Sequence, residues 1–306
     1  IFSQSDQLAA AMVSPRVWLR VILASLLSCG HALVHLRRKD AMVPKLSVMV
    51  IAARQDTRTV RDVVRKMWHE VDDPQGQLCM RFAFCNSPVD AYEASLHAEK
   101  ADMGDLLFLN CEEGYGHGDL TKKVIKMMEA YVDHQGDDCL NRDLLLKVDM
   151  DTFVAGHNFR HALNNAWAQH GATIYAGCSC KQGEPERDPQ SRWYEPYSVW
   201  PYDYPLSMCG GSGYILGRSL VQQIIDEGLP EKYLLWNEDR AVAVWIGQLQ
   251  HRGTKVNWVN IPGTNGFEWD EHYKSGPWGS YPFALHHGVD PLTMACMTDL
   301  DKVNDP

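Results

Sequence analysis

Residues 144–154 read LLLKVDMDTFV, in which an apolar run at 144–148 is followed by two acidic residues, Asp149 and Asp151. The run predicts a buried strand of an open α/β sheet, and ligands of such sheets bind beyond the carboxyl ends of the strands. If the chain is still extended there, residues two apart point the same way, so both carboxylates can reach one cation. Hard oxygen ligands favour Mg²⁺ or Mn²⁺, either of which can bridge a diphosphate. The alternative is a solvated acidic pair that caps the next helix.

Towards the N-terminus, apolar strand patterns alternate with amphipathic helix patterns. Strands are predicted at residues 45–53, 78–85 and 105–110, and helices at residues 56–68, 88–100 and 120–131. This alternation predicts parallel crossovers, and therefore an α/β fold whose sheet is covered by helices on both faces.

Towards the C-terminus the composition changes. Residues 171–215 are rich in Gly, Pro, Tyr and Trp, and residues 187–205 carry four prolines, four tyrosines and two tryptophans. A loop-rich aromatic region of this kind typically forms a binding wall on a rigid sheet. Helices are predicted to follow at residues 216–227 and 239–251.

Three motifs in this second half carry residues that are suited to chemistry. They are a glycine cluster (Gly210, Gly211 and Gly213), an acidic pair (Glu238 and Asp239) and a histidine pair (His286 and His287). The glycines allow close backbone approach to a ligand, or form only a tight turn. The acidic pair can supply a general base, or simply favour the dipole of the helix that it begins. The histidine pair can complete a metal shell or be structural.

The composition excludes some classes of protein. Lys and Arg number 29 against 39 Asp and Glu, which gives a formal net charge of −10 and argues against a nucleic-acid partner, because phosphate neutralisation requires a basic face. The nine cysteines include no C-x-x-C pair, so a zinc site is not expected. They predict two or three disulfides in an oxidising compartment, with at least one thiol unpaired.

The N-terminal residues have a different character from the rest of the chain. Residues 17–36 contain a short apolar stretch that is preceded by arginines, and fit a signal peptide, a weak signal anchor or an ordinary helix. We therefore expect a targeting and stem-like segment at residues 1–44 and one domain at residues 45–306. Within the domain, residues 45–151 form the nucleotide-binding half and residues 152–306 the acceptor-binding half.

Read together, the motifs of residues 45–290 resemble those of the β-1,3-glycosyltransferases, the galactosyltransferase-type enzymes of the secretory pathway (glycosyltransferase family 31). In order, they are R-x-x-x-R-x-x-W at 61–68, a helix start similar to N-L-T-x-K at 119–123, a strand end similar to K-x-D-D-D-x-F-V at 147–154, a stretch similar to P-x-R-D-x-x-S-K-W-Y at 185–194, a loop similar to Y-P-x-Y-C-x-G-x-G-Y at 204–214 and an acidic pair similar to E-D-V at 238–240. Several motifs in the right order are more specific than any one of them.

The resemblance implies a GT-A type nucleotide-sugar transferase fold, with a single Rossmann-like mixed sheet. It also implies a UDP-sugar donor, Mn²⁺ or Mg²⁺ as cofactor, and inversion at the anomeric carbon. Galactose is the family's default sugar, transferred in β-1,3 linkage to a glycan, glycoprotein or glycolipid acceptor. The expected location is the Golgi or ER lumen, with the chain either anchored in the membrane as a type II protein or secreted.

The resemblance also implies roles for individual residues. Asp149 and Asp151 would hold metal and donor, and His286 or His287 would be the late metal ligand. Asp239 would deprotonate the acceptor, with Glu238 beside it. The residues at the UDP end would be Arg61, Arg65 and Lys147, and those that shape the sugar sites would be Trp193, Tyr194, Gly210, Gly211 and Gly213. Asp151 is expected to be the better metal ligand of the two aspartates.

The chain departs from the family pattern at three positions. Met150 replaces the middle Asp of the family's triple, Arg240 replaces Val after the acidic pair, and Asp119 replaces Asn. The outer aspartates remain, so metal binding is expected, while ribose contacts and acceptor fit are open. Two other readings compete with an active transferase: an inactive GT-A domain that binds a glycan or partner, and an unrelated Mg²⁺-dependent phosphotransfer enzyme.

Overall fold

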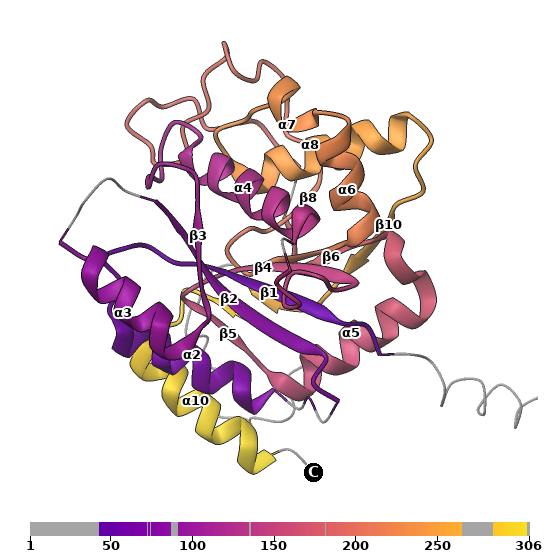
Figure 1. The fold of residues 1–306 in the computed structure, drawn as a ribbon. Helices are drawn as coiled ribbons and strands as arrows, with labels where there is room; N and C mark the ends of the chain where they lie inside the picture. The colour runs from indigo at the N-terminus through magenta and orange to yellow at the C-terminus, as the bar shows by residue number, and fades with distance from the viewer. Residues whose placement is uncertain are drawn as a thin grey trace, which may run out of the picture. The chain divides into compact units, whose positions relative to one another are not determined.

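A computed structural model describes residues 43–304, apart from 72, 74, 87–90, 135, 181 and 265–283 (Figure 1). The expected targeting segment at residues 17–36 therefore lies outside the described residues, as does Cys29. Within the described ranges, every helix is too short or too polar to span a membrane.

A seven-stranded sheet forms the centre of the domain, with the strand order β10-β6-β9-β4-β1-β2-β3. Its strands are β1 (Leu46–Ile51), β2 (Leu78–Cys85), β3 (Leu106–Leu109), β4 (Leu144–Asp149), β6 (Ile174–Gly177), β9 (Tyr214–Gly217) and β10 (Asn257–Asn260). The predicted strands of the first half are confirmed, and β1 pairs in parallel with both β2 and β4. Strand β9 is antiparallel to β4 and β6, so the sheet is mixed.

Helices cover both faces of this sheet, as expected (Figure 1). They are α2 (Arg58–Glu70), α3 (Glu93–Met103), α4 (Asp119–Asp133), α5 (Gly156–His170), α6 (Arg218–Asp226), α7 (Leu229–Lys232), α8 (Glu238–His251) and α10 (Pro291–Asn304), with a 3₁₀ turn, η1, at Gly171–Thr173. Strand alternation explains the two cores, because successive side chains point to opposite faces. Val48 and Val50 pack with α2 and α5, while Met49 packs with α4, α6 and α8.

The helix predicted at residues 216–227 begins later than expected. Tyr214–Gly217 is strand β9, and α6 starts only at Arg218. The apolar residues Ile215 and Leu216 are fully buried on opposite faces of the sheet, which is a strand pattern. The helix predicted at residues 88–100 is α3, which runs from Glu93 to Met103.

Two small sheets complete the fold next to the carboxyl end of β4. One contains β5 (Thr152–Val154), β12 (Leu285–His287) and β11 (Gly263–Thr264), and the other contains β7 (Ser179–Cys180) and β8 (Ser207–Met208). Strand β12 runs antiparallel to β5, with His287 opposite Thr152. This pairing brings the late histidines beside the turn that follows β4.

Three disulfides link described cysteines: Cys79–Cys139, Cys85–Cys111 and Cys180–Cys209. Cys178 and Cys296 are unpaired, which confirms the expectation of two or three disulfides with at least one thiol left over. The adjacent pair Cys178 and Cys180 is not joined, because Cys180 bonds to the start of the glycine loop.

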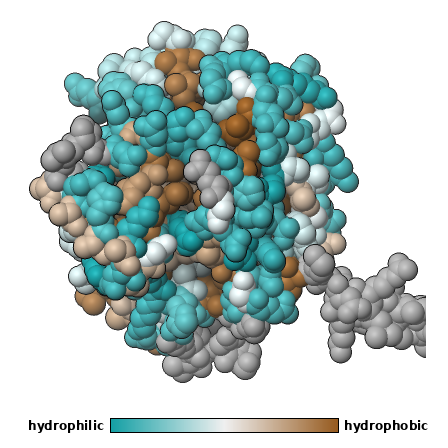
Figure 2. Space-filling view, viewed as in Figure 1, coloured by the Kyte–Doolittle hydropathy of each residue, from teal (hydrophilic) through white to brown (hydrophobic). Residues whose placement is uncertain are grey.

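Hydrophilic residues cover most of the face of the molecule shown in Figure 2, and hydrophobic residues lie in patches between them. The apolar side chains of the sheet and helices are instead gathered in the two cores on either side of the sheet.

Candidate active site

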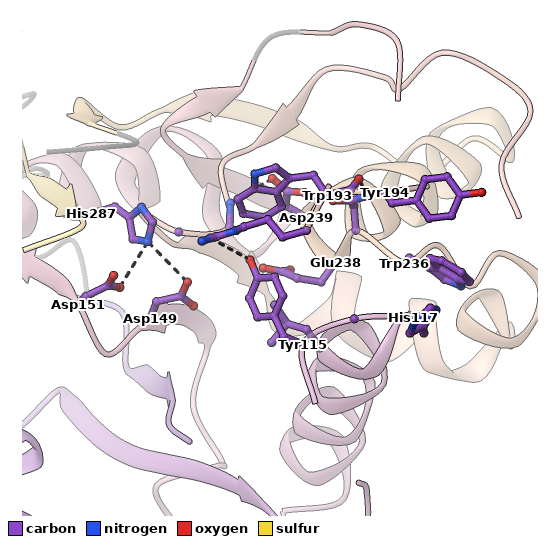
Figure 3. A pocket seen from close by; sticks show the side chains of 16 residues that line it. Tyr115, His117, Asp149, Asp151, Trp193, Tyr194, Trp236, Glu238, Asp239 and His287 are labelled. Atoms are coloured by element: carbon purple, nitrogen blue, oxygen red, sulfur yellow. Dashed lines mark hydrogen bonds and ion pairs between the residues drawn. The ribbon is translucent and has the colours of Figure 1, made fainter. Parts of the chain in front are cut away.

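A cleft of ≈ 380 Å³ opens where β4 ends and α8 begins. It is lined by Tyr115, Gly116, His117, Leu120, Asp149, Asp151, Arg192, Trp193, Tyr194, Gly210, Gly211, Trp236, Asn237, Glu238, Asp239 and His287. Figure 3 shows two aspartates and His287 at one end, Asp239 and Tyr115 in the middle, and Trp236 at the other end. The cleft thus collects the acidic motifs, the glycine loop and the aromatic region that the sequence singled out.

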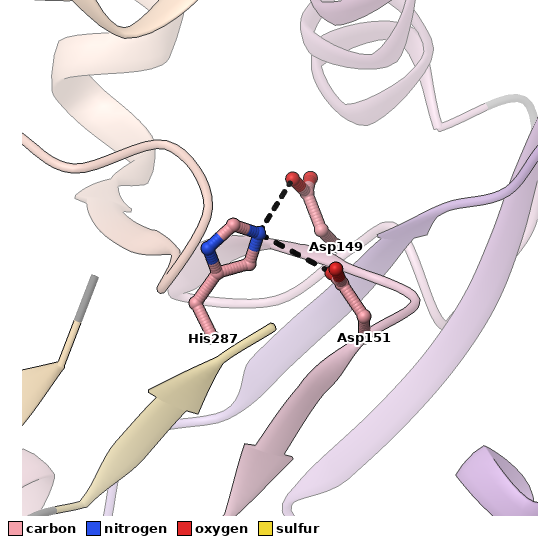
Figure 4. Close-up of side chains that lie close together, drawn as sticks. All are labelled: Asp149, Asp151 and His287. Carbon is pink, nitrogen blue, oxygen red and sulfur yellow. Dashed lines mark ion pairs between the residues drawn. The ribbon is translucent and has the colours of Figure 1, made fainter. Parts of the chain in front are cut away.

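The first end of the cleft holds a cluster with the chemistry of a metal site. Asp149 is the last residue of β4, Asp151 lies in the turn before β5, and His287 ends β12. The His287 Nε2 atom lies 3.3 Å from Asp151 Oδ1 and 3.8 Å from Asp149 Oδ2 (Figure 4). One ligand atom from each residue falls within 4.8 Å of the others. A tight turn at 150–151, not the extended chain expected from the i, i+2 spacing, brings the two carboxylates to the same place.

The structure distinguishes between the two candidate histidines. Neighbouring residues of a strand point to opposite sides, so only one of them can face the aspartates. His286 is buried near the Phe153 ring, and burial lowers its pKa to about 4. His287 is the residue that faces Asp149 and Asp151, and it is therefore the histidine that the structure offers to a metal.

The charges of this cluster support one another. Burial lowers the pKa of His287, but the hydrogen bond and charge of Asp151 outweigh it and raise the pKa above its usual value. In the same way, burial raises the pKa of Asp151, and the contact with His287 more than reverses this, so the Asp151 pKa is lowered. The contact between His287 and Asp151 thus stabilises the charged forms of both groups, and a bound metal would replace it.

A buried lysine connects this cluster to the acidic pair of α8. Alternation along β4 points Lys147 toward the core below α8, where only 1% of its side chain is exposed. Its Nζ lies 2.8 Å from Asp149 Oδ1 and 2.6 Å from Glu238 Oε1, and donates to the Gly210 carbonyl at 2.8 Å. Burial lowers the pKa of Lys147, but the two carboxylates outweigh it and the net pKa is raised. Lys147 is therefore the positive centre between the two acidic motifs.

Asp239 faces the middle of the cleft from the first turn of α8. The Gly210 N–H donates to its Oδ2 at 3.3 Å, and 23% of its side chain is exposed. Burial and the neighbouring Glu238 charge raise the pKa of Asp239 above that of an ordinary aspartate. Glu238 is more deeply buried and is held by Lys147 and by the Tyr214 hydroxyl at 3.0 Å. Of the acidic pair, Asp239 is thus the carboxylate that is available to accept a proton.

The glycine loop fits tightly between these groups. A Cβ at Gly210 would lie 2.2 Å from Glu238 Oε1, and a Cβ at Gly211 would lie 2.5 Å from the His287 ring. Gly213 has a φ of +98° and sits against the Lys147 carbonyl. The Cys180–Cys209 disulfide anchors the start of the loop. The three glycines are therefore required by close packing at the site.

Substituting Gly211 with alanine is expected to weaken Mn²⁺-dependent UDP binding by about 10- to 100-fold, as is usual when the support of a metal ligand is disturbed. The new methyl group would displace the His287 ring. Calorimetric titration of UDP in the presence of Mn²⁺ measures the effect. Gly247→Ala is the control, because a Cβ at that helical glycine meets nothing within 4 Å. Equal affinity in the two variants would contradict the role given to His287.

Aromatic side chains form the other wall of the cleft. The Tyr115 and Trp193 rings meet edge to face at 5.9 Å, as do the Tyr194 and Trp236 rings at 5.7 Å. Arg192 lies over the Trp193 ring at 4.3 Å and donates to the Tyr115 hydroxyl at 3.4 Å, the dashed line at Tyr115 in Figure 3. The wall offers flat apolar faces and one guanidinium to a cleft otherwise lined by four carboxylates.

Arg61 and Arg65 do not line this cleft. Both lie on α2 and are engaged by acidic residues: Arg61 Nε donates to Glu99 at 2.8 Å, and Arg65 Nε donates to Asp105 at 2.7 Å. Arg61 is 3% exposed. These ion pairs fasten α2 to the α3–β3 edge, away from the residues that line the cleft.

Seven residues that line the cleft escaped the sequence predictions, and four of them have aromatic or cationic side chains, namely Tyr115, His117, Arg192 and Trp236. Two of them had a signal, since Arg192 lies within the recognised stretch at 185–194 and Trp236 stands two residues before the acidic pair. Tyr115 and His117 occur in the run GYGHG, a glycine-rich segment directly before α4, whose composition is typical of a ligand-binding loop.

The chain matches the galactosyltransferase family model over residues 59–255. It is 29% identical over 170 residues to human beta-1,3-galactosyltransferase 9, a match that covers 54% of this chain and 43% of the relative. It is 24% identical over 241 residues to beta-1,3-galactosyltransferase GALT1 of Arabidopsis thaliana, covering 78% and 34%, and 23% identical over 203 residues to mouse beta-1,3-galactosyltransferase 1, covering 66% and 60%. The chain thus spans between 34% and 60% of the length of these relatives.

Similar solved structures are glycosyltransferases. One is the galactosyltransferase LgtC in complex with donor and acceptor sugar analogs, at 12% identity and a TM-score of 0.41, covering 85% of this chain and 96% of that one. Another is the mannosyltransferase PcManGT from Pyrobaculum calidifontis in complex with GDP-Man and Mn²⁺, at 14% identity and a TM-score of 0.42, covering 79% and 65%.

Proposed function

The chain belongs to the galactosyltransferase family, and from that premise we propose that it moves a hexose, galactose in the first instance, from a UDP-sugar to a glycan hydroxyl in β-1,3 linkage with inversion. One observation carries the proposal. A single cleft places Asp149, Asp151 and His287 at one end and the Asp239 carboxylate beside them in the middle. An inverting transfer needs a site for the leaving diphosphate and a base for the acceptor, and these two groups suit those roles.

The first group suits Mn²⁺, or Mg²⁺. Two carboxylate oxygens and one imidazole nitrogen lie within 4.8 Å of one another, and this mixed set of hard oxygen and nitrogen ligands fits Mn²⁺ well. When bound, the metal ion would neutralise charge that develops on the leaving diphosphate. Asp151 and His287 would be its main ligands, because Asp149 is also paired with Lys147.

The second group suits the acceptor. As the acceptor oxygen forms its bond to the anomeric carbon, the Asp239 carboxylate takes the hydroxyl proton. The bond from that carbon to the UDP oxygen breaks and its electron pair leaves with UDP. Burial and the neighbouring Glu238 charge raise the pKa of Asp239, which makes it a better base than an exposed aspartate. The faces of Trp193 and Tyr194 are suited to the apolar face of a pyranose ring.

The disulfides are the basis on which we propose a location for the protein. Three disulfides among the described residues fit an oxidising compartment, and they do not by themselves identify the organelle. We place the enzyme in the lumen of the Golgi or ER, where family members meet glycoprotein and glycolipid acceptors. Residues 17–36 would serve as its anchor or signal.

UDP release from a panel of UDP-sugars, in Mn²⁺ or in EDTA, tests the proposed function. We expect release with one donor, lost in EDTA and reduced at least about 100-fold by Asp151→Ala, the scale of an electrostatic group in a dry site. Asp102→Ala is the control, because that aspartate is exposed and its ion pair among the described residues is with Arg58, on the outer surface.

Two other outcomes would change the conclusion. Mn²⁺-dependent UDP binding with no release from any donor, even with a panel of glycan acceptors, would identify a binding module. Absence of UDP binding, with or without metal, would refute the proposed function altogether.

A further inference from the structure

Glu195 is a fully buried carboxylate that lies behind the aromatic wall. Its Oε2 accepts hydrogen bonds from the Tyr204 hydroxyl at 2.8 Å and from the Asn237 N–H at 3.1 Å, and its Oε1 accepts from the Trp236 N–H at 3.0 Å. The Asn237 side-chain amide donates to it as well, at 3.2 Å. Across the described part of the chain, no Lys, Arg or His forms an ion pair with this carboxylate.

A buried carboxylate without a cation needs other compensation, because its desolvation is costly. Here the compensation comes from the start of α8. Successive backbone N–H groups at a helix N-terminus and the positive end of the helix dipole both stabilise an anion. Asn237 is the N-cap residue of α8, yet its side chain makes no capping bond to its own helix. Glu195, 42 residues earlier in the chain, supplies the acidic group at this helix start instead.

The two residues that follow Asn237 are Glu238 and Asp239. The position of the Asn237 N–H therefore sets where the first turn of α8 begins, and with it where the Asp239 carboxylate lies. On its other side, Glu195 directly follows Trp193 and Tyr194, which line the cleft. One buried carboxylate thus ties the aromatic wall to the first turn of the catalytic helix.

We propose that Glu195 is a positioning residue for the transfer reaction, which holds Asp239 in register with the acceptor pocket. The inference rests on the proposed function. Among the described residues, the hydrogen bonds of the Glu195 carboxylate go to Tyr204, Trp236 and Asn237 and not to the metal-type cluster or Lys147, so we assign its effect to the acceptor side. A residue of general structural importance would instead reduce donor binding and transfer together.

Glu195→Gln tests this role, because it keeps the shape of the side chain and replaces one acceptor oxygen with an amide that faces other donors. We expect kcat to fall about 10- to 100-fold, the range for a small displacement of a catalytic group. The KM for the UDP-sugar and the Mn²⁺-dependent affinity for UDP should stay within about twofold, which is a few tenths of a kcal/mol. Hydrogen exchange in a peptide covering residues 236–240 should become faster.

Glu186→Gln is the matched control. Glu186 lies on the same segment, its side chain is exposed, and its carboxylate accepts from the Asp188 N–H at 2.9 Å. Unchanged kcat in Glu195→Gln, or a parallel loss of UDP affinity and kcat, would overturn the positioning role. A wild-type protein that fails to transfer with every donor and acceptor would instead refute the proposed function, and the two failures are therefore distinguishable.

Discussion

Asp239→Asn is expected to reduce transfer by about 10²- to 10⁴-fold, the usual contribution of a general base, while UDP binding stays intact. Asparagine has the same shape as aspartate but cannot accept the acceptor proton. The donor side is separate, since Asp239 makes its hydrogen bond to the Gly210 N–H and not to the metal-type cluster. Transfer measured by UDP release with saturating donor and acceptor, beside calorimetric binding of UDP with Mn²⁺, gives both quantities.

Asp226→Asn provides the control for this substitution. Asp226 ends α6 on the surface and, in the part of the chain that the structure describes, accepts a hydrogen bond from the Gln222 amide at 2.8 Å, so its replacement should leave transfer unchanged. Removing a general base should leave at most about a hundredth of the wild-type rate. If Asp239→Asn retained more than about a tenth of that rate, another group would have to be the base. Glu238 would be the next carboxylate to examine, although Lys147 and Tyr214 already hold it.

Lys147→Met is expected to have the largest effect on stability. It removes the cation between Asp149 and Glu238, which leaves Glu238 without its buried cation and Asp149 with the His287 ring at 3.8 Å. Breaking a buried ion pair by removing one partner costs about 3–5 kcal/mol, a large share of the free energy of unfolding of a domain. Urea unfolding followed by tryptophan fluorescence measures the loss.

A double variant separates the charge effect from loss of packing. Adding Glu238→Gln to Lys147→Met removes the carboxylate that lost its buried cation, and should recover more than about 1 kcal/mol of the loss if charge is responsible. Lys126→Met is the surface control, because Lys126 is 37% exposed and its partner within the described ranges is the exposed Glu129. A Lys147→Met variant as stable as this control would show that the buried pairing contributes nothing to the fold.

The parts of the fold that depend on local patterns could be predicted, and those that depend on distant partners could not. Continuous apolar runs identified the strands at 45–53 and 144–148, because a strand that is buried on both faces has apolar residues at nearly every position. The short strand at 214–217 follows three glycines and leads into a helix, so the helix predicted at 216–227 includes its last two residues, Leu216 and Gly217. Its pairing with β4 and β6 in the structure identifies this segment as a strand.

The site follows the same rule. Asp149, Asp151 and Asp239 lie in local motifs that predicted chemistry, and the structure places them in one cleft. The choice of His287 over His286 required the register of β12 on β5, which joins segments more than 130 residues apart. The R-x-x-x-R spacing of α2 correctly places Arg61 and Arg65 on one helix face. It could not reveal that acidic residues of α3 and of the segment before β3 meet them there.

Two of the disulfides determine how this protein should be produced for any of these assays. Cys85–Cys111 joins the carboxyl ends of β2 and β3, and Cys180–Cys209 anchors the glycine loop, so both lie on the side of the sheet where the cleft opens. They close segments with separations of 26 and 29 residues, each worth about 3 kcal/mol in the chain-entropy view. The bacterial cytosol keeps thiols reduced, so a chain made there would have the same apolar cores but would lack these two disulfides beside the cleft. A secretory or periplasmic host is therefore the appropriate source, and lysis and storage buffers should be free of thiol reductants.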